Sequence, residues 1–330
     1  MSEIPNHSSP QYSEDARNDA LFHYTSADGL IGILRNEEIW GTAYYCANDE
    51  SELATGKGIL TPIFSLATHK MIEANDPLVR TFSARGVDIL EYARGFEPNI
   101  IAHALSVLCA YITCFCKPTG AEDFSHGLLS QWRGYGADGG YALQFSRKKL
   151  LAAIEKANNA QDLNYQLQDV HYTAANPLKA EVLSHTDAFL GAYKDLLDEL
   201  GQPLNIVLSK KTERNPIASL LGGPLESLLD YLLHTKNQHF GEEKECRLSL
   251  VEAVSSSAEV LPINYFNRGG LIVPYKKTPR STFRLLDCIE WIVVGPSSRM
   301  GARFKSVAQM VGQAGLAIGV RPSHIPLTRA

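Results

Sequence analysis

The sequence predicts an α+β protein with one large domain, and three observations carry that prediction. The chain has 330 residues, of which 45% are hydrophobic and 20% charged, a balance typical of a globular protein with a hydrophobic core. Segments with strand and helix periodicity alternate irregularly along the chain. The glycines at 134–140 precede a strand rather than a helix, so they form neither a dinucleotide-binding fingerprint nor a phosphate-binding loop.

Local patterns divide the chain as follows. Residues 1–20 are polar and predict a flexible tail. Residues 21–330 form the domain, with a mainly helical insertion at about 148–238. Strands are expected at 21–25, 38–45, 111–118, 141–146, 245–253 and 289–296. Helices are expected at 27–36, 61–80, 98–110, 148–158, 175–200 and 299–315. Turns are expected at 48–60 and over most of 128–140.

Charge is distributed unevenly around a net value of -5. From Arg268 to the end of the chain, ten basic residues face only two acidic ones, whereas the rest of the chain is acidic. This asymmetry has two interpretations, which the sequence leaves open. The basic end can contact a phosphate-rich partner, or the two parts can attract each other within one fold.

The six cysteines lie mostly in apolar runs, which indicates reduced, buried thiols rather than disulfides. Cys114 and Cys116 would share one strand face, but the sequence has no second ligand pair to complete a metal site, so we expect no metal. No apolar run approaches the roughly 20 residues of a membrane span, and the N-terminus lacks the pattern of a signal peptide. We therefore expect a cytoplasmic protein without membrane contacts.

The first of three clusters with chemical potential is residues 22–26. In a strand, His23 and Thr25 share one face and Tyr24 lies on the other, while Ser26 can cap the following helix. A histidine beside a hydroxyl at a strand end can hold a sugar hydroxyl. The alternative is a strand histidine whose ring is bonded to the backbone.

The second cluster is the segment with Gln131, Trp132, Arg133 and Tyr135. Aromatic rings on a glycine-flexed turn can stack on a planar ring of a ligand, and an arginine can hold a phosphate. The alternative is that Trp132 anchors the segment in the core.

The third cluster contains Glu243, Glu245 and Arg247. Strand alternation would put all three on one face, where Arg247 can keep one carboxylate ionised while the other works. The alternative is a solvated charged face on an edge strand.

Six motifs in this order resemble the DUF2971 family of bacterial proteins, over about residues 21 to 327. The motifs are His23–Ser26, Asn48 with Asp49 and Glu52, Cys114–Phe115, Gln131–Phe145, Phe240–Arg247 and Ile289–Pro296. The family is similar to the ADP-ribosyltransferase superfamily, so the resemblance implies a split β-sheet core with helical insertions and NAD as substrate.

The resemblance also implies roles for individual residues. Glu245 would be the catalytic carboxylate, with Glu243 placing the acceptor nucleophile and Tyr135 stacking near nicotinamide. His23 would contact the ribose on the adenosine side of NAD. The remaining NAD contacts would come from these clusters: Tyr24, Thr25, Ser26, Gln131, Trp132, Arg133 and Arg247.

The implied function is transfer of ADP-ribose to a macromolecule, in a toxin or phage-defence effector with an antitoxin or regulator protein as partner. The acceptor, nucleic acid or protein, stays open. Hydrolysis of NAD by water and a non-enzymatic nucleotide- or partner-binding module are the alternatives. Replacing Glu245 by glutamine is expected to abolish turnover and to leave folding intact.

Overall fold

The computed structural model describes residues 13–46, 50–95, 109–135, 140–173, 233–252 and 261–326, with the helical positions 186, 190, 191, 193, 194 and 197. The strands are β1 (Ala20–Thr25), β2 (Trp40–Ala43), β3 (Cys109–Cys116), β4 (Tyr141–Ser146), β5 (Tyr165–Asp169), β6 (His171–Thr173), β7 (Thr235–Asn237), β8 (Glu245–Glu252), β9 (Asn264–Arg268), β10 (Leu271–Lys277), β11 (Ile289–Val294) and β12 (Gly319–Pro322).

The α-helices are α1 (Glu14–Asn18), α2 (Ala27–Asn36), α3 (Glu50–Glu73), α4 (Pro77–Ala84), α6 (Ala121–His126), α7 (Leu129–Tyr135), α8 (Arg147–Gln161), α13 (Arg280–Phe283) and α14 (Met300–Gln313). Three short 3-10 helices complete the set: η1 (Tyr44–Cys46), η2 (Gln238–Glu243) and η3 (Leu285–Cys288). Mixed helices with a mostly antiparallel sheet agree with the α+β class.

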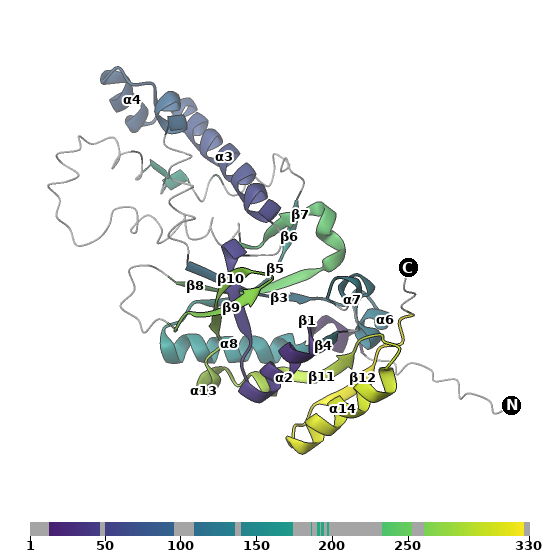
Figure 1. Ribbon diagram of the computed structural model, residues 1–330. Helices are drawn as coiled ribbons and strands as arrows, with labels where there is room; N and C mark the ends of the chain where they lie inside the picture. Colours follow the sequence, from purple (N-terminus) through teal and green to yellow (C-terminus); the bar gives the residue numbers. More distant parts are fainter. Residues whose placement is uncertain are drawn as a thin grey trace.

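The ten-stranded sheet forks at β3 (Figure 1). On one edge, β8 pairs with β3 along its whole length. The other edge is shared by two strands, because β2 pairs at Tyr111 and Ile112 whereas β1 pairs at Cys116. One branch continues from β1 through β4 and β11 to β12, and the other from β2 through β10 to β9. Residues 113–115 of β3 therefore lie where the two branches separate.

Alternating side chains give the sheet a core on each face. On one face, Leu21, Phe115 and Phe145 pack with side chains of α8 and α14. On the other face, Phe22 and Cys116 pack with side chains of α6 and α7. A further cluster surrounds α3, which extends away from the sheet with α4 at its far end (Figure 1).

Trp132 anchors α7 into the second of these cores. Its side chain is 1% exposed, its ring meets Tyr24 edge-on at 4.8 Å, and its indole N–H donates to the His126 carbonyl at 2.8 Å. Gly295 lies directly against the ring, where a Cβ atom would stand 2.7 Å from the indole. The sequence interpretation of Trp132 as an anchor thus matches its position.

The structure differs from several sequence predictions. The expected turn at 48–60 is wrong, because α3 begins at Glu50. The first half of 128–140 is the helix α7, and residues 136–139 lie outside the described residues. Most of the helix expected at 98–110 also lies outside them, and its last two residues begin β3. The expected strand at 38–45 is shorter and ends in η1.

The interval expected as a helical insertion, about 148–238, is described only in part. Its first part holds most of α8, as expected, but also β5, which pairs with β8 in the main sheet. The short strand β6 in its first third pairs with β7 near its end. Of the helix expected at 175–200, only the few helical positions given above are described.

The basic end of the chain pairs with the acidic part inside the fold. Lys277 bonds to Glu38 at 3.1 Å, and Arg280 pairs with Glu37. Arg303 lies over the Tyr141 ring. The two ion pairs agree with attraction between the two parts, but exposed pairs contribute little to stability, so the interpretation as a surface for a phosphate-rich partner stays open.

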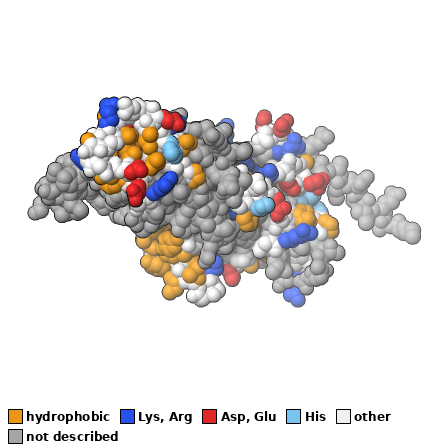
Figure 2. Space-filling view, turned by 90° about the horizontal axis from the view of Figure 1, so that it is seen from above, with side chains coloured by type: hydrophobic (Ala, Val, Ile, Leu, Met, Phe, Trp, Pro, Cys, Tyr) orange, Lys and Arg blue, Asp and Glu red, His pale blue; other side chains and the backbone are white. Residues whose placement is uncertain are grey.

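The described surface also carries exposed large hydrophobic side chains, including Tyr265 and Ile272 on the β9–β10 hairpin. On the face shown in Figure 2, hydrophobic side chains gather at the lower left, whereas the upper left mixes them with charges of both signs. No helix in the described ranges is long and apolar enough to cross a bilayer.

We predict that Gly295→Ala lowers the free energy of unfolding by about 1–3 kcal/mol, because the added methyl group overpacks the Trp132 ring. Gly32→Ala is the control, since Gly32 lies within α2 and its Cβ would meet nothing within 4 Å. That change should raise stability by up to about 1 kcal/mol. Urea unfolding measures both, and equal effects of the two changes would contradict this account of Trp132 packing.

Candidate active site at the fork

Glu245 is the first residue of β8 and is 3% exposed. Its Oε1 accepts from Arg247 Nε at 2.8 Å, and its Oε2 accepts from Lys236 Nζ at 3.2 Å and Arg247 Nη2 at 3.3 Å. Its backbone N–H donates to the Tyr172 hydroxyl at 2.7 Å. A buried carboxylate requires such partners, because an unpaired charge would cost several kcal/mol.

These contacts keep Glu245 ionised. Burial acts to raise the pKa of Glu245, but the charge and hydrogen bonds of Arg247 outweigh it, together with the charge of Lys236 and a hydrogen bond with Cys114. The pKa of the carboxyl group falls from the usual 4.5 to about 2. Arg247 is itself 2% exposed, and its Nη1 donates to the Leu233 carbonyl at 2.6 Å. This guanidinium is therefore committed to the interior and not placed to meet a pyrophosphate.

Glu243 reaches the same place by a different route. The expectation that Glu243 and Glu245 share one strand face is wrong, because Glu243 ends η2 and β8 begins only at Glu245. Between them, Lys244 has a φ of 47° in the left-handed region and ends η2, so the alternation of a continuous strand does not run through Glu243. Lys236 then joins the two carboxylates, donating to Glu243 Oε2 at 2.8 Å and to Glu245 Oε2 at 3.2 Å.

His23 lies where β1 leaves β3. Its Nδ1 is 3.0 Å from the Cys114 carbonyl, and since a carbonyl oxygen only accepts, Nδ1 carries the proton. Burial lowers the pKa of His23 below its usual 6.5, although the bond to Cys114 opposes this effect. In the neutral ring, Nε2 is then an acceptor.

Cys114 lies between His23 and Glu245. The ladders place Phe22, Cys116 and Glu245 opposite one another, so these three share one face, whereas His23 shares the other face with its partner Leu143. The His23 ring turns into the fork toward the Cys114 carbonyl. The Cys114 side chain is in turn one of the groups whose hydrogen bonding lowers the pKa of Glu245.

The rest of the first cluster serves the fold. The Tyr24 hydroxyl accepts from the Leu128 N–H at 2.7 Å, and Ser26 caps α2 by accepting from the Gly29 N–H at 3.2 Å, as its position predicted. The Thr25 side chain lies against Gly29.

The second cluster lies on the same face of the sheet as Glu245. Helix α7 contacts both β1 and η2, which brings it beside the short helix η2 that ends in Glu243. Gln131 and Trp132 are buried, and Arg133 is exposed. The side chain of Tyr135 lies outside the described residues.

Sequence reasoning missed Lys236 and Tyr172. They are register partners on the short parallel strands β6 and β7, which aim both side chains at the start of β8. Only this long-range pairing distinguishes them from other lysines and tyrosines of the chain. Cys114 was expected to be a buried thiol but is exposed, whereas Cys46, Cys116, Cys246 and Cys288 are buried, and all five are free thiols.

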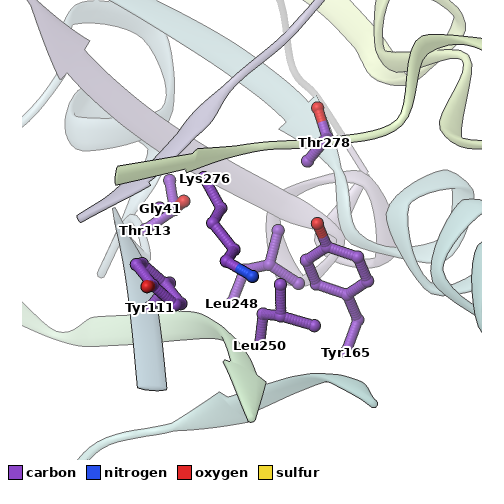
Figure 3. A pocket seen from close by; sticks show the side chains of 8 residues that line it. All are labelled: Gly41, Tyr111, Thr113, Tyr165, Leu248, Leu250, Lys276 and Thr278. Carbon is purple, nitrogen blue, oxygen red and sulfur yellow. The ribbon is translucent and has the colours of Figure 1, made fainter. Parts of the chain in front are cut away.

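A small cavity of about 10 Å³ lies elsewhere, between β2 and β10 on one side and β3, β5 and β8 on the other. The buried Lys276 side chain points into it between Tyr111 and Tyr165, toward Leu248 and Leu250 (Figure 3). Such a volume suits one water molecule rather than a nucleotide. Over the described ranges, no group of three histidine, cysteine or acidic residues is placed to hold a metal ion.

Comparison with known proteins places the second and third clusters within one family. Residues 131–248 match the family described as "Protein of unknown function (DUF2971)", which supports the DUF2971 resemblance over the part of the chain that holds the motifs Gln131–Phe145 and Phe240–Arg247. The search of curated proteins found no match, and the search of solved structures found none either.

We predict that Glu245 makes stability depend on acid pH. A depressed carboxyl pKa stabilises the folded state fully above the ordinary pKa, and this contribution is lost as the pH falls from about 4.5 toward 2. The contribution is about 3 kcal/mol. Urea unfolding between pH 7 and 2.5 should show this fall in the wild type and a correspondingly flatter profile for Glu245→Gln.

The burial of Glu245 and its pairing with Arg247 change what we expect of the stability of this variant, because the sequence alone predicted that glutamine leaves folding intact. Removing the carboxylate leaves Arg247 buried without it, so Glu245→Gln should lose about 3–5 kcal/mol at neutral pH. Glu290→Gln is the control, because its pair with Lys149 is exposed and worth less than about 1 kcal/mol. Parallel pH profiles for the wild type and Glu245→Gln would contradict the assigned role of the ion pair.

Proposed function

We propose that the protein is an NAD-dependent ADP-ribosyltransferase whose catalytic carboxylate is Glu245. The observation that carries this proposal is an ionised, rigidly held carboxylate at the fork of the sheet. A forked sheet is also what the implied split β-sheet core requires. The DUF2971 match supports the motif resemblance from which the NAD chemistry was inferred.

The chemistry needs a fixed negative charge. When the bond between nicotinamide and ribose breaks, its electron pair leaves with the nicotinamide nitrogen and positive charge develops on the sugar. Glu245 would stabilise that charge without reorganising, because Arg247 already fixes its orientation.

The neighbouring residues fit supporting roles. The His23 Nε2 atom would accept a hydrogen bond from the second ribose, which agrees with a neutral ring protonated on Nδ1. This role requires NAD to reach through the fork, because His23 and Glu245 start from opposite faces of the sheet. Glu243 is more accessible than Glu245, so it would take the proton of the acceptor as the new bond to the sugar forms. Arg133, which is exposed on α7, would meet the pyrophosphate.

The acceptor would be a macromolecule, nucleic acid or protein. Among the basic residues near the end of the chain, Arg299 and Lys305 are exposed at the first turns of α14 and would serve a phosphate-rich acceptor. An effector role in the cytoplasm, with an antitoxin or regulator protein as partner, follows from the resemblance alone.

One observation favours a second candidate, a non-enzymatic nucleotide-binding module. Glu245 is almost fully buried and paired with two cations, which is also how a purely structural ion pair would look. Calorimetric titration with NAD followed by analysis of the recovered nucleotide separates the two. A binding module would bind NAD and return it unchanged, whereas an enzyme would consume it.

The test uses purified protein, NAD labelled on the adenylate and a cell lysate. We expect label that becomes sensitive to nuclease or to protease, according to the acceptor, whereas free ADP-ribose would indicate hydrolysis. Glu245→Gln should reduce turnover at least about 100-fold, in line with the loss of a preorganised charge. Glu243→Gln should reduce transfer and spare the slower reaction with water.

The loss of stability expected for Glu245→Gln requires a matched control. Val311→Ala removes buried methyl groups in α14, at about 2 kcal/mol. That helix packs on β11, which stands four strands, or about 19 Å, from β8. Turnover should survive in Val311→Ala. Full activity in a folded Glu245→Gln protein would eliminate the proposed mechanism.

A further inference from the structure

Lys236 occupies the centre of the charged cluster. Its ammonium group donates to Glu243 Oε2 at 2.8 Å and to Glu245 Oε2 at 3.2 Å, and its side chain is 10% exposed. The ring of Phe240 lies 4.8 Å below the ammonium group, where the ring face favours a cation and excludes water.

One ammonium group that bonds to two carboxylates brings them close together. Two carboxylates that share one hydrogen-bond donor repel each other. In a poorly solvated site one of them takes up a proton unless a cation lies between them. Arg247 bonds to Glu245, so its charge is directed at one member of the pair. Lys236 is directed at both.

We propose that Lys236 is a positioning residue for the proposed reaction, holding the Glu243 and Glu245 carboxylates side by side with both of them ionised. The inference rests on the proposed function, in which Glu245 stabilises the sugar cation and Glu243 receives the acceptor proton. Both roles need the charged form of the carboxylate at the same pH. Lys236 meets that requirement from a separate element, β7.

The groups around the ammonium define the background for any titration. Among the described residues, the groups that contact the ammonium or couple to it by charge include Glu243 of η2, Glu245 and Arg247 of β8, Tyr172 of β6 and Cys116 of β3. Burial raises the pKa values of Tyr172 and Cys116, and the two carboxylates raise them further. Both groups therefore stay neutral below pH 8, and titration between pH 2 and 7 reports on the carboxylates.

The competing explanation is that Lys236 only fastens η2 to β7. The first measurement distinguishes these views without NAD, by following the side-chain carboxyl ¹³C resonances of Glu243 and Glu245 against pH. We expect Lys236→Met to raise the pKa of Glu245 by about one unit or more, because the charge of Lys236 helps to lower it. Lys236→Arg should restore values near the wild type because it keeps the charge, and Lys236→Gln replaces the methionine variant if the latter does not fold.

The matched control is Lys277→Met, which removes another partly buried lysine–carboxylate pair, with Glu38, on a different branch of the sheet. It should leave the titrations of Glu243 and Glu245 unchanged. Unchanged titrations in folded Lys236→Met would overturn the proposal, whether or not the protein uses NAD.

The second measurement is the pH dependence of NAD turnover. In Lys236→Met the acid limb of the plot of kcat against pH should shift to higher pH by the same amount as the carboxyl titration. The KM for NAD should change little. A shifted titration with an unmoved acid limb would reduce Lys236 to a structural link and overturn its positioning role. If the wild type turns over no NAD, the proposed function fails, and the titration alone decides whether Lys236 holds the pair.

Discussion

The start of β8 depends on one constraint, which is that a carboxylate buried in a protein must be compensated. Glu245 stands at 3% exposure beside Arg247 at 2%, and neither side chain is tolerable there without the other. Their partners come from segments distant in sequence, because Lys236 belongs to β7, Tyr172 to β6 and Cys114 to β3. Satisfying one buried charge thus ties three separate strands to the start of β8.

The fork of the sheet provides the place for this arrangement. Because β1 and β2 share one edge of β3, the strand ladder is interrupted between them, and a side chain can enter the gap. The His23 ring does so and bonds to the carbonyl of Cys114, whose side-chain hydrogen bonding helps to lower the pKa of Glu245. The same geometry that splits the sheet therefore connects the histidine and the glutamate that the resemblance singled out.

Local patterns predicted those parts of the fold that local physics determines. The strands around Leu21, Tyr141 and Ile289 were predicted from their apolar periodicity, as was helix α2 with its Ser26 cap. The left-handed backbone of Lys244 was not predicted, because lysine rarely adopts it and only the surrounding contacts impose it. The role of Lys236 was equally out of reach, since it arises from the pairing of β6 with β7 rather than from the sequence around it.

The left-handed backbone of Lys244 explains why Glu243 and Glu245, which are separated by this single residue, can act differently. In a continuous strand they would share the same face and the same solvation, and their charges would compete. The left-handed residue Lys244 leaves Glu243 on η2 with 27% of its side chain exposed, whereas Glu245 begins β8 with 3% exposed. One carboxylate is thereby held rigid by Arg247 while the other keeps access to solvent. A fixed charge for a cationic sugar and an accessible base for an incoming nucleophile are different tasks, and Lys244 separates them within three residues.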